Sequence, residues 1–122
     1  MLIGIDINET KEYVSASDKG DNPTVFLIGN LTNAFKMSTI GSIILPDGKV
    51  DMKAVQTKAG EIVRSGIKGV RGFYDSTQKK AVDLKADEIT PEFLEKLPAS
   101  VLYELAGKVL EFNFASEGEI KN

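Results

Sequence analysis

The residues best suited to chemistry lie in one short phrase, "SGIKGVRGFYD", at positions 65–75. Three glycines recur at every third position, Lys68 and Arg71 lie between them, and Phe73 and Tyr74 follow. Glycine amides and cations can bind phosphate, and aromatic rings can stack on nucleic-acid bases. The phrase is therefore a phosphate-binding loop, a piece of nucleic-acid-binding surface, or the end of a helix that runs into a strand.

The spacing of the glycines favours the last interpretation. No G-x-x-x-x-G-K-[ST] loop is present, and a dinucleotide fingerprint would follow a strand, whereas these glycines follow a predicted helix. The string "GIKG" matches the clamp of a KH domain, but the residues after it are strand-like. We expect Gly66 to end the helix in a left-handed conformation. Nucleic-acid contact through Lys68 and Arg71 is the alternative.

The composition excludes several reaction types. The chain of 122 residues contains no Cys and no His, so it has no thiol nucleophile, imidazole base or disulfide. Its 18 acidic residues are scattered along the chain, which is typical of solvated surface charge. We therefore predict no catalytic residue, no metal site and no cofactor. The net charge of −3 argues against a dedicated nucleic-acid-binding domain, which is usually basic.

The apolar runs are too short to predict a membrane span, and the N-terminus lacks the pattern of a signal peptide. The expected location is therefore the cytoplasm.

The hydrophobic pattern predicts one α+β domain over residues 1–122, with a small antiparallel sheet. Strands are expected near residues 2–7, 24–32, 67–74 and 80–85, and helices near 51–65, 90–97 and 98–113. Residues 33–45 fit a helix or a strand equally well. The polar segment 115–122 predicts a frayed end.

Capping residues and apolar stripes support the predicted helices. Asp51 is a candidate N-cap, and Thr90 followed by Pro91 is typical of a helix start. The first helix places Met52, Val55, Ala59, Ile62 and Val63 on one face, and the last places Val101, Leu102, Leu105, Ala106, Val109 and Leu110 on another.

The phenylalanines are expected to pack in the core, with one alternative. Phe112 and Phe114 follow the strongest part of the last apolar stripe and could dock on a partner instead. The candidate partner-binding residues are Lys68, Arg71, Phe73, Tyr74, Phe112 and Phe114.

Three phrases carry a resemblance to a known family. They are "VRSGIKGVRGFYD" at 63–75, "LPASVLYELAGKVLEFN" at 97–113 and "SEGEIKN" at 116–122, and the strand "PTVFLIGNLT" at 23–32 fits the same pattern. In this order they resemble the small tail assembly chaperones of long-tailed bacteriophages. The resemblance covers the C-terminal 70 or so residues well and the remainder loosely. The family often has Trp where Val70 stands.

The resemblance implies a protein without enzymatic activity. Members of that family are thought to hold the long, aggregation-prone tape-measure protein while the tail tube polymerises around it. The implied partner is thus the tape-measure protein or another tail protein, in the cytoplasm of a bacterial host.

Two other functions stay open at this point. The chain could be a structural component of the virion, such as a small tail or head–tail joining protein, which would form symmetric rings. Less favoured is a nucleic-acid-binding module built on Lys68, Arg71, Phe73 and Tyr74. The sequence does not decide whether the chain forms a homo-oligomer.

Overall fold

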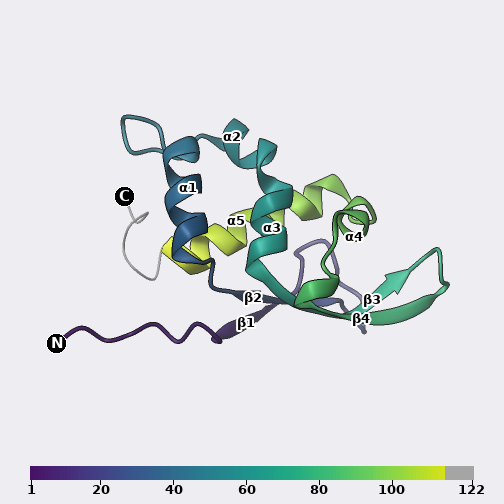
Figure 1. Ribbon diagram of the computed structural model, residues 1–122. Coiled ribbons are helices and arrows are strands. Elements are labelled where there is room, and N and C mark those ends of the chain that lie inside the picture. The colour runs from purple at the N-terminus through teal and green to yellow at the C-terminus, as the bar shows by residue number, and fades with distance from the viewer. Residues whose placement is uncertain (115–122) are drawn as a thin grey trace.

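The computed structural model describes residues 1–114, apart from the side chain of Ile40. It contains a four-stranded antiparallel sheet with helices on one face, which confirms the predicted α+β class (Figure 1). The elements are β1 (Thr10–Tyr13), β2 (Val25–Gly29), α1 (Asn33–Ile43), α2 (Met52–Thr57), α3 (Ala59–Gly66), β3 (Ile67–Asp75), β4 (Lys80–Lys85), the 3-10 turn η1 (Ala86–Glu88), α4 (Pro91–Glu95) and α5 (Ala99–Phe114). The predicted frayed end at 115–122 lies outside the described residues.

The strands pair in the order β1-β2-β3-β4, each antiparallel to its neighbour. The predicted strands near 24–32, 67–74 and 80–85 are confirmed as β2, β3 and β4. The strand predicted at 2–7 is wrong, because a turn in which Glu9 N donates to Asp6 O (3.1 Å) separates this segment from the sheet. The first strand is β1 instead, a polar segment in which Tyr13 packs against the core.

The third glycine of the phrase bends β3. The register between β3 and β4 shifts between Val70 and Phe73, and Gly72 there has a φ of +69°. Glycine adopts this left-handed backbone without a steric cost. The Gly72 amide donates to Asp83 Oδ1 at 2.8 Å, so the irregular residue keeps a hydrogen bond within the sheet.

The helix predicted over 51–65 is two helices. Asp51 is the N-cap, and its Oδ1 accepts from the amides of Lys53 (3.1 Å) and Ala54 (3.3 Å), as expected. Lys58 then leaves the helical conformation and separates α2 from α3. Val55 before the break and Ile62 after it are both buried, so the helical spacing of apolar residues continues across Lys58. The break therefore could not be predicted from the hydrophobic pattern.

Gly66 has a different role from the predicted one. It is the last residue of α3 and does not have a positive φ, so the predicted left-handed cap is wrong. A Cβ at this position would lie 2.2 Å from Val109 Cγ1 on α5. Gly66 therefore allows α3 and α5 to pack closely.

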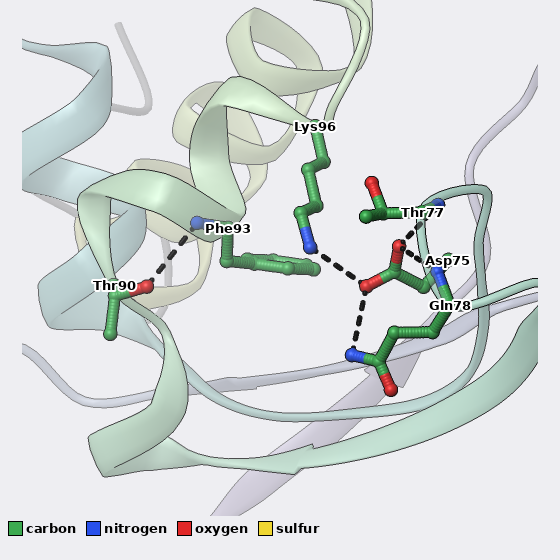
Figure 2. A network of polar contacts seen from close by, with 6 residues as sticks. All are labelled: Asp75, Thr77, Gln78, Thr90, Phe93 and Lys96. Atoms are coloured by element: carbon green, nitrogen blue, oxygen red, sulfur yellow. Dashed lines mark hydrogen bonds and ion pairs between the residues drawn. The ribbon is translucent and has the colours of Figure 1, made fainter.

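Local capping explains the other helices. The ambiguous residues 33–45 form α1, where Thr32 Oγ1 accepts from the Phe35 amide at 3.1 Å. Thr90 caps α4 as predicted, accepting from the Phe93 amide at 3.2 Å (Figure 2). The predicted helices near 90–97 and 98–113 are confirmed as α4 and α5, with ends that differ by up to two residues.

The core lies between the helix-facing side of the sheet and helices α3 and α5. The sheet contributes Phe26, Ile28 and Val70, and the predicted α5 stripe is buried except for the half-buried Leu102. Asn113 is also buried: its Oδ1 accepts from Leu31 N (2.7 Å), and its Nδ2 donates to the carbonyls of Gly29 (3.1 Å) and Val109 (2.8 Å). This side chain ties the end of β2 to α5.

Candidate functional site

The two cations of the glycine phrase are both engaged within the chain. The aliphatic part of Lys68 covers Gly29, where an added Cβ would lie 2.6 Å from Lys68 Cγ, and its Nζ donates to Ser65 O at 2.7 Å. Burial lowers the pKa of Lys68. Arg71 forms an ion pair with Glu12 of β1. Arg71 is thus paired with a carboxylate, whereas Lys68 donates to a neutral backbone carbonyl.

The glycine backbone also belongs to the sheet. As predicted, a helix stops and a strand starts in this phrase, with α3 ending at Gly66 and β3 beginning at Ile67. β3 pairs with β2 on one side and β4 on the other, and Gly72 N bonds to Asp83. A phosphate cradle needs several free amides that converge on one point. Here the phrase lies in the middle of a sheet.

The predicted aromatic residues point to different parts of the molecule. Phe73 faces the helices and makes an edge-to-face contact with Phe93, at 5.1 Å between ring centroids and 75° between ring planes. Tyr74 is 60% exposed on the β3–β4 hairpin. Phe112 is half-buried on α5, and Phe114 is 3% exposed in the core, so Phe114 is not presented to a partner. The six candidate residues do not form one site.

The most engaged carboxylate is Asp75, at the end of β3 (Figure 2). It is 3% exposed, and its Oδ2 accepts from Lys96 Nζ at 2.7 Å and from Gln78 Nε2 at 3.3 Å. The amides of Thr77 (2.9 Å) and Gln78 (3.3 Å) bond to Oδ1. The hydrogen bond from Lys96, followed by these two amides, outweighs burial and lowers the pKa of Asp75. This network fastens the hairpin turn to α4.

A second carboxylate, that of Glu104, links β1 and the following turn to α5 through hydrogen bonds. Glu104 accepts from the hydroxyls of Tyr13 and Ser15 (2.7 Å for Ser15) and from the Ala16 amide at 2.9 Å. Burial alone would raise the pKa of Glu104, but these three hydrogen bonds lower it. Burial, reinforced by Glu104, raises the pKa of Tyr13 to about 12. Sequence reasoning missed both carboxylates, although "DSTQ" is a recognisable turn in which an Asp binds the following amides.

The described surface contains an apolar groove, which we call the Met52 groove. It has a volume of about 250 Å³ and lies between the α1–α2 region and α5. Its lining residues are Ile43, Val50, Met52, Val55, Gly107, Leu110 and Glu111. Met52 was predicted to face the core with the α2–α3 stripe, but it is 62% exposed. The groove therefore carries an apolar side chain in contact with water.

A larger groove, of about 650 Å³, runs between the N-terminal segment, β1 and α5. Its lining mixes charged residues such as Lys11, Lys108 and Glu111 with Tyr13 and Phe112. Phe112 is the one predicted partner-binding residue that lies there. This groove is too mixed in polarity to indicate one class of ligand.

Within residues 1–114, no three acidic side chains converge as a metal site would require. None of the helices in the same range is both long and apolar enough to span a bilayer. Comparison of the chain with protein-family models, with curated proteins and with solved structures gives no match.

Proposed function

We propose that this chain is a non-enzymatic bacteriophage tail morphogenesis protein, namely a tail assembly chaperone that binds the tape-measure protein. The observation that carries the proposal is the Met52 groove, an apolar surface bounded by helices and lined by Met52 and Leu110. The resemblance of the phrases at 63–75 and 97–113 to tail assembly chaperones supplies the identity of the partner.

The size of the groove suits a partner side chain better than a metabolite. Sites for small ligands generally occupy roughly 300–1,000 Å³ and contain several convergent polar groups. The Met52 groove has about 250 Å³, and Glu111 is the one charged residue in its lining. An amphipathic helix binds by inserting apolar side chains into such a groove. Methionine suits this role because its flexible thioether adapts to different partner surfaces.

The state of the carboxylates supports a function without catalysis. A general base at neutral pH works best with a pKa near 7. Asp75 and Glu104 instead have lowered pKa values, and their oxygens accept hydrogen bonds that join distant elements. Both side chains therefore have a structural role, which does not suit them to act as general bases.

Co-expression tests this proposal. The chain is produced together with the proposed partner, a tape-measure protein, and the soluble fraction is captured through a tag on the smaller chain. We expect the large protein to co-purify and to be more soluble than when it is expressed alone. Absence of both effects would contradict the proposal.

A second function, a structural component of the virion, is favoured by a different observation. The N-terminal residues carry a row of exposed apolar side chains, which is a feature of subunits that assemble. Purified particles distinguish the two functions, because a structural component stays in the mature virion whereas a chaperone is absent from it.

A further inference from the structure

Gly107 keeps the α5 side of the Met52 groove free of a side chain. This glycine lies exposed in the middle of α5, among the residues that line the groove. A Cβ built on it would meet nothing within 4 Å among the described residues. A side chain at this position would therefore extend into the groove.

The packing of the domain does not require a glycine at position 107. Gly66 of α3 must lack a side chain, because a Cβ there would lie 2.2 Å from Val109 Cγ1. Gly107 makes no such close approach within the described chain, and its φ is not positive. Glycine also destabilises the interior of a helix relative to alanine. What the glycine provides at this position is open space beside the α5 backbone.

The surroundings of this open space are apolar. Ile43, Val55 and Leu110 line the groove and are themselves buried, so their positions are fixed by the core. Met52 is 62% exposed, and its flexible side chain can rearrange around an occupant. An apolar side chain that entered beside Gly107 would leave water for apolar surroundings, which is favourable.

Glu111 is the one charged residue among the described residues of the lining. It follows Gly107 by one turn of α5, a rise of about 6 Å. Its side chain is 63% exposed and pairs with Lys108 at 3.4 Å, and exposed pairs of this kind contribute little to stability. Lys108 also lies over the Tyr13 ring, 5.6 Å from the ring centroid, so it keeps a favourable contact without Glu111. A cation from another molecule can therefore take the place of Lys108.

We propose that Gly107 and Glu111 select the segment that the groove binds. That segment is an amphipathic helix with a large apolar side chain beside Gly107 and a Lys or Arg opposite Glu111. This inference rests on the proposed function and specifies the chemistry of the tape-measure helix that is bound. Residues three or four apart lie on one face of a helix, so a helix that runs along α5 presents the apolar side chain and the cation together.

Filling the space beside Gly107 tests the apolar half of this proposal. We expect Gly107→Leu to weaken binding of the tape-measure protein at least about ten-fold, as loss of an interface anchor does. Gly41→Leu is the matched control and should bind like the natural chain. Gly41 also lies exposed in a helix, α1, with nothing described within 4 Å of an added Cβ, and it is outside the groove lining. Circular dichroism and thermal unfolding show whether each variant is folded.

Reversing the charge of Glu111 tests the polar half and needs no change in the shape of the groove. Glu111→Lys should also weaken binding at least about ten-fold. The loss should be smaller in about 1 M salt, because salt screens exposed charges. Glu95→Lys makes the same change of charge at an exposed position of α4 outside the lining, and this variant should bind like the natural chain.

The outcomes separate this inference from the proposed function. A natural chain that does not bind the tape-measure protein would contradict the proposed function and, with it, this inference. A natural chain that binds, with an affinity that folded Gly107→Leu or Glu111→Lys leaves unchanged, would overturn this inference alone. Sedimentation of the chain by itself gives a further outcome. A natural dimer that Gly107→Leu returns to the mass of one chain would identify a second copy as the occupant, which would also overturn the inference.

Discussion

At the scale of single residues, two carboxylates, the buried Asp75 and the half-buried Glu104, connect distant elements. Asp75 joins the hairpin turn to α4 through Lys96, and Glu104 joins β1 and the following turn to α5 through Tyr13 and Ser15. Such side chains are expensive to bury unless they are paired and hydrogen-bonded. Their protonation should therefore affect the stability of the fold.

Asp75 should contribute stability that depends on pH. Its pKa is lowered in the folded state, so its contribution is complete above the unfolded value of about 3.9 and is lost as the pH falls through the folded value. Asp75→Asn should therefore be less stable than the natural chain at pH 7, and the difference should shrink towards pH 3. Urea unfolding at several pH values measures this. A difference that does not change with pH would contradict the assigned network.

Tyr13 should ionise at a higher pH than a free tyrosine side chain, whose pKa is about 10. Its pKa is raised to about 12 by burial and by Glu104. Because the folded pKa lies above the unfolded one, the stabilisation is complete below about pH 10 and is lost as the pH rises through about 12. In an alkaline ultraviolet titration, the part of the absorbance change that Tyr13→Phe removes should be centred near pH 12, and Glu104→Gln should move it to lower pH. A Tyr13 signal centred near the free value of about 10 would be inconsistent with this contact.

At the scale of elements, the position of α3 against α5 depends on Gly66. A Cβ there would meet Val109 Cγ1 at 2.2 Å, whereas a Cβ at Gly107 in α5 meets nothing within 4 Å. We expect Gly66→Ala to destabilise the domain by about 1–3 kcal/mol through overpacking. Gly107→Ala should be neutral or stabilising by up to about 1 kcal/mol. Thermal unfolding of both variants checks this, and equal effects would mean that the helices are not in close contact.

The elements that the sequence predicts well are those with strong local signals. β2 is rich in β-branched and aromatic residues, the hairpin contains a turn phrase, and α5 has a long apolar stripe. The errors concern interactions that no local pattern contains. β1 is polar and owes its place to Tyr13 and to pairing with β2, and the break at Lys58 leaves the apolar spacing intact.

The candidate site was less predictable than the fold, because it too depends on contacts that no local sequence pattern contains. Lys68, Arg71, Phe73 and Tyr74 are neighbours in sequence, but a strand sends alternate side chains to opposite faces and the bulge at Gly72 changes that alternation. The Met52 groove combines residues between 43 and 55 with residues 107–111 of α5, and these two segments are far apart in the sequence. A sequence pattern could not have assembled it.

At the scale of the whole molecule, an apolar core and polar contacts between elements hold the domain together, and the proposed function uses apolar surface that remains exposed. The helices cover one face of the sheet, and residues 1–7 extend from one edge (Figure 1). The Met52 groove lies between the α1–α2 region and α5. A small acidic protein that covers apolar helices would also supply them with solubilising charge.

The affinity of matched variants for the proposed partner, the tape-measure protein, tests the central claim most directly. Met52→Asp places a charge in the groove, and Met37→Asp makes the same substitution at an exposed position of α1 outside the groove lining. We predict that Met52→Asp weakens binding at least about ten-fold, as loss of an interface anchor does, while Met37→Asp binds like the natural chain. Unchanged binding by a folded Met52→Asp variant, or loss of binding in Met37→Asp instead, would contradict the account.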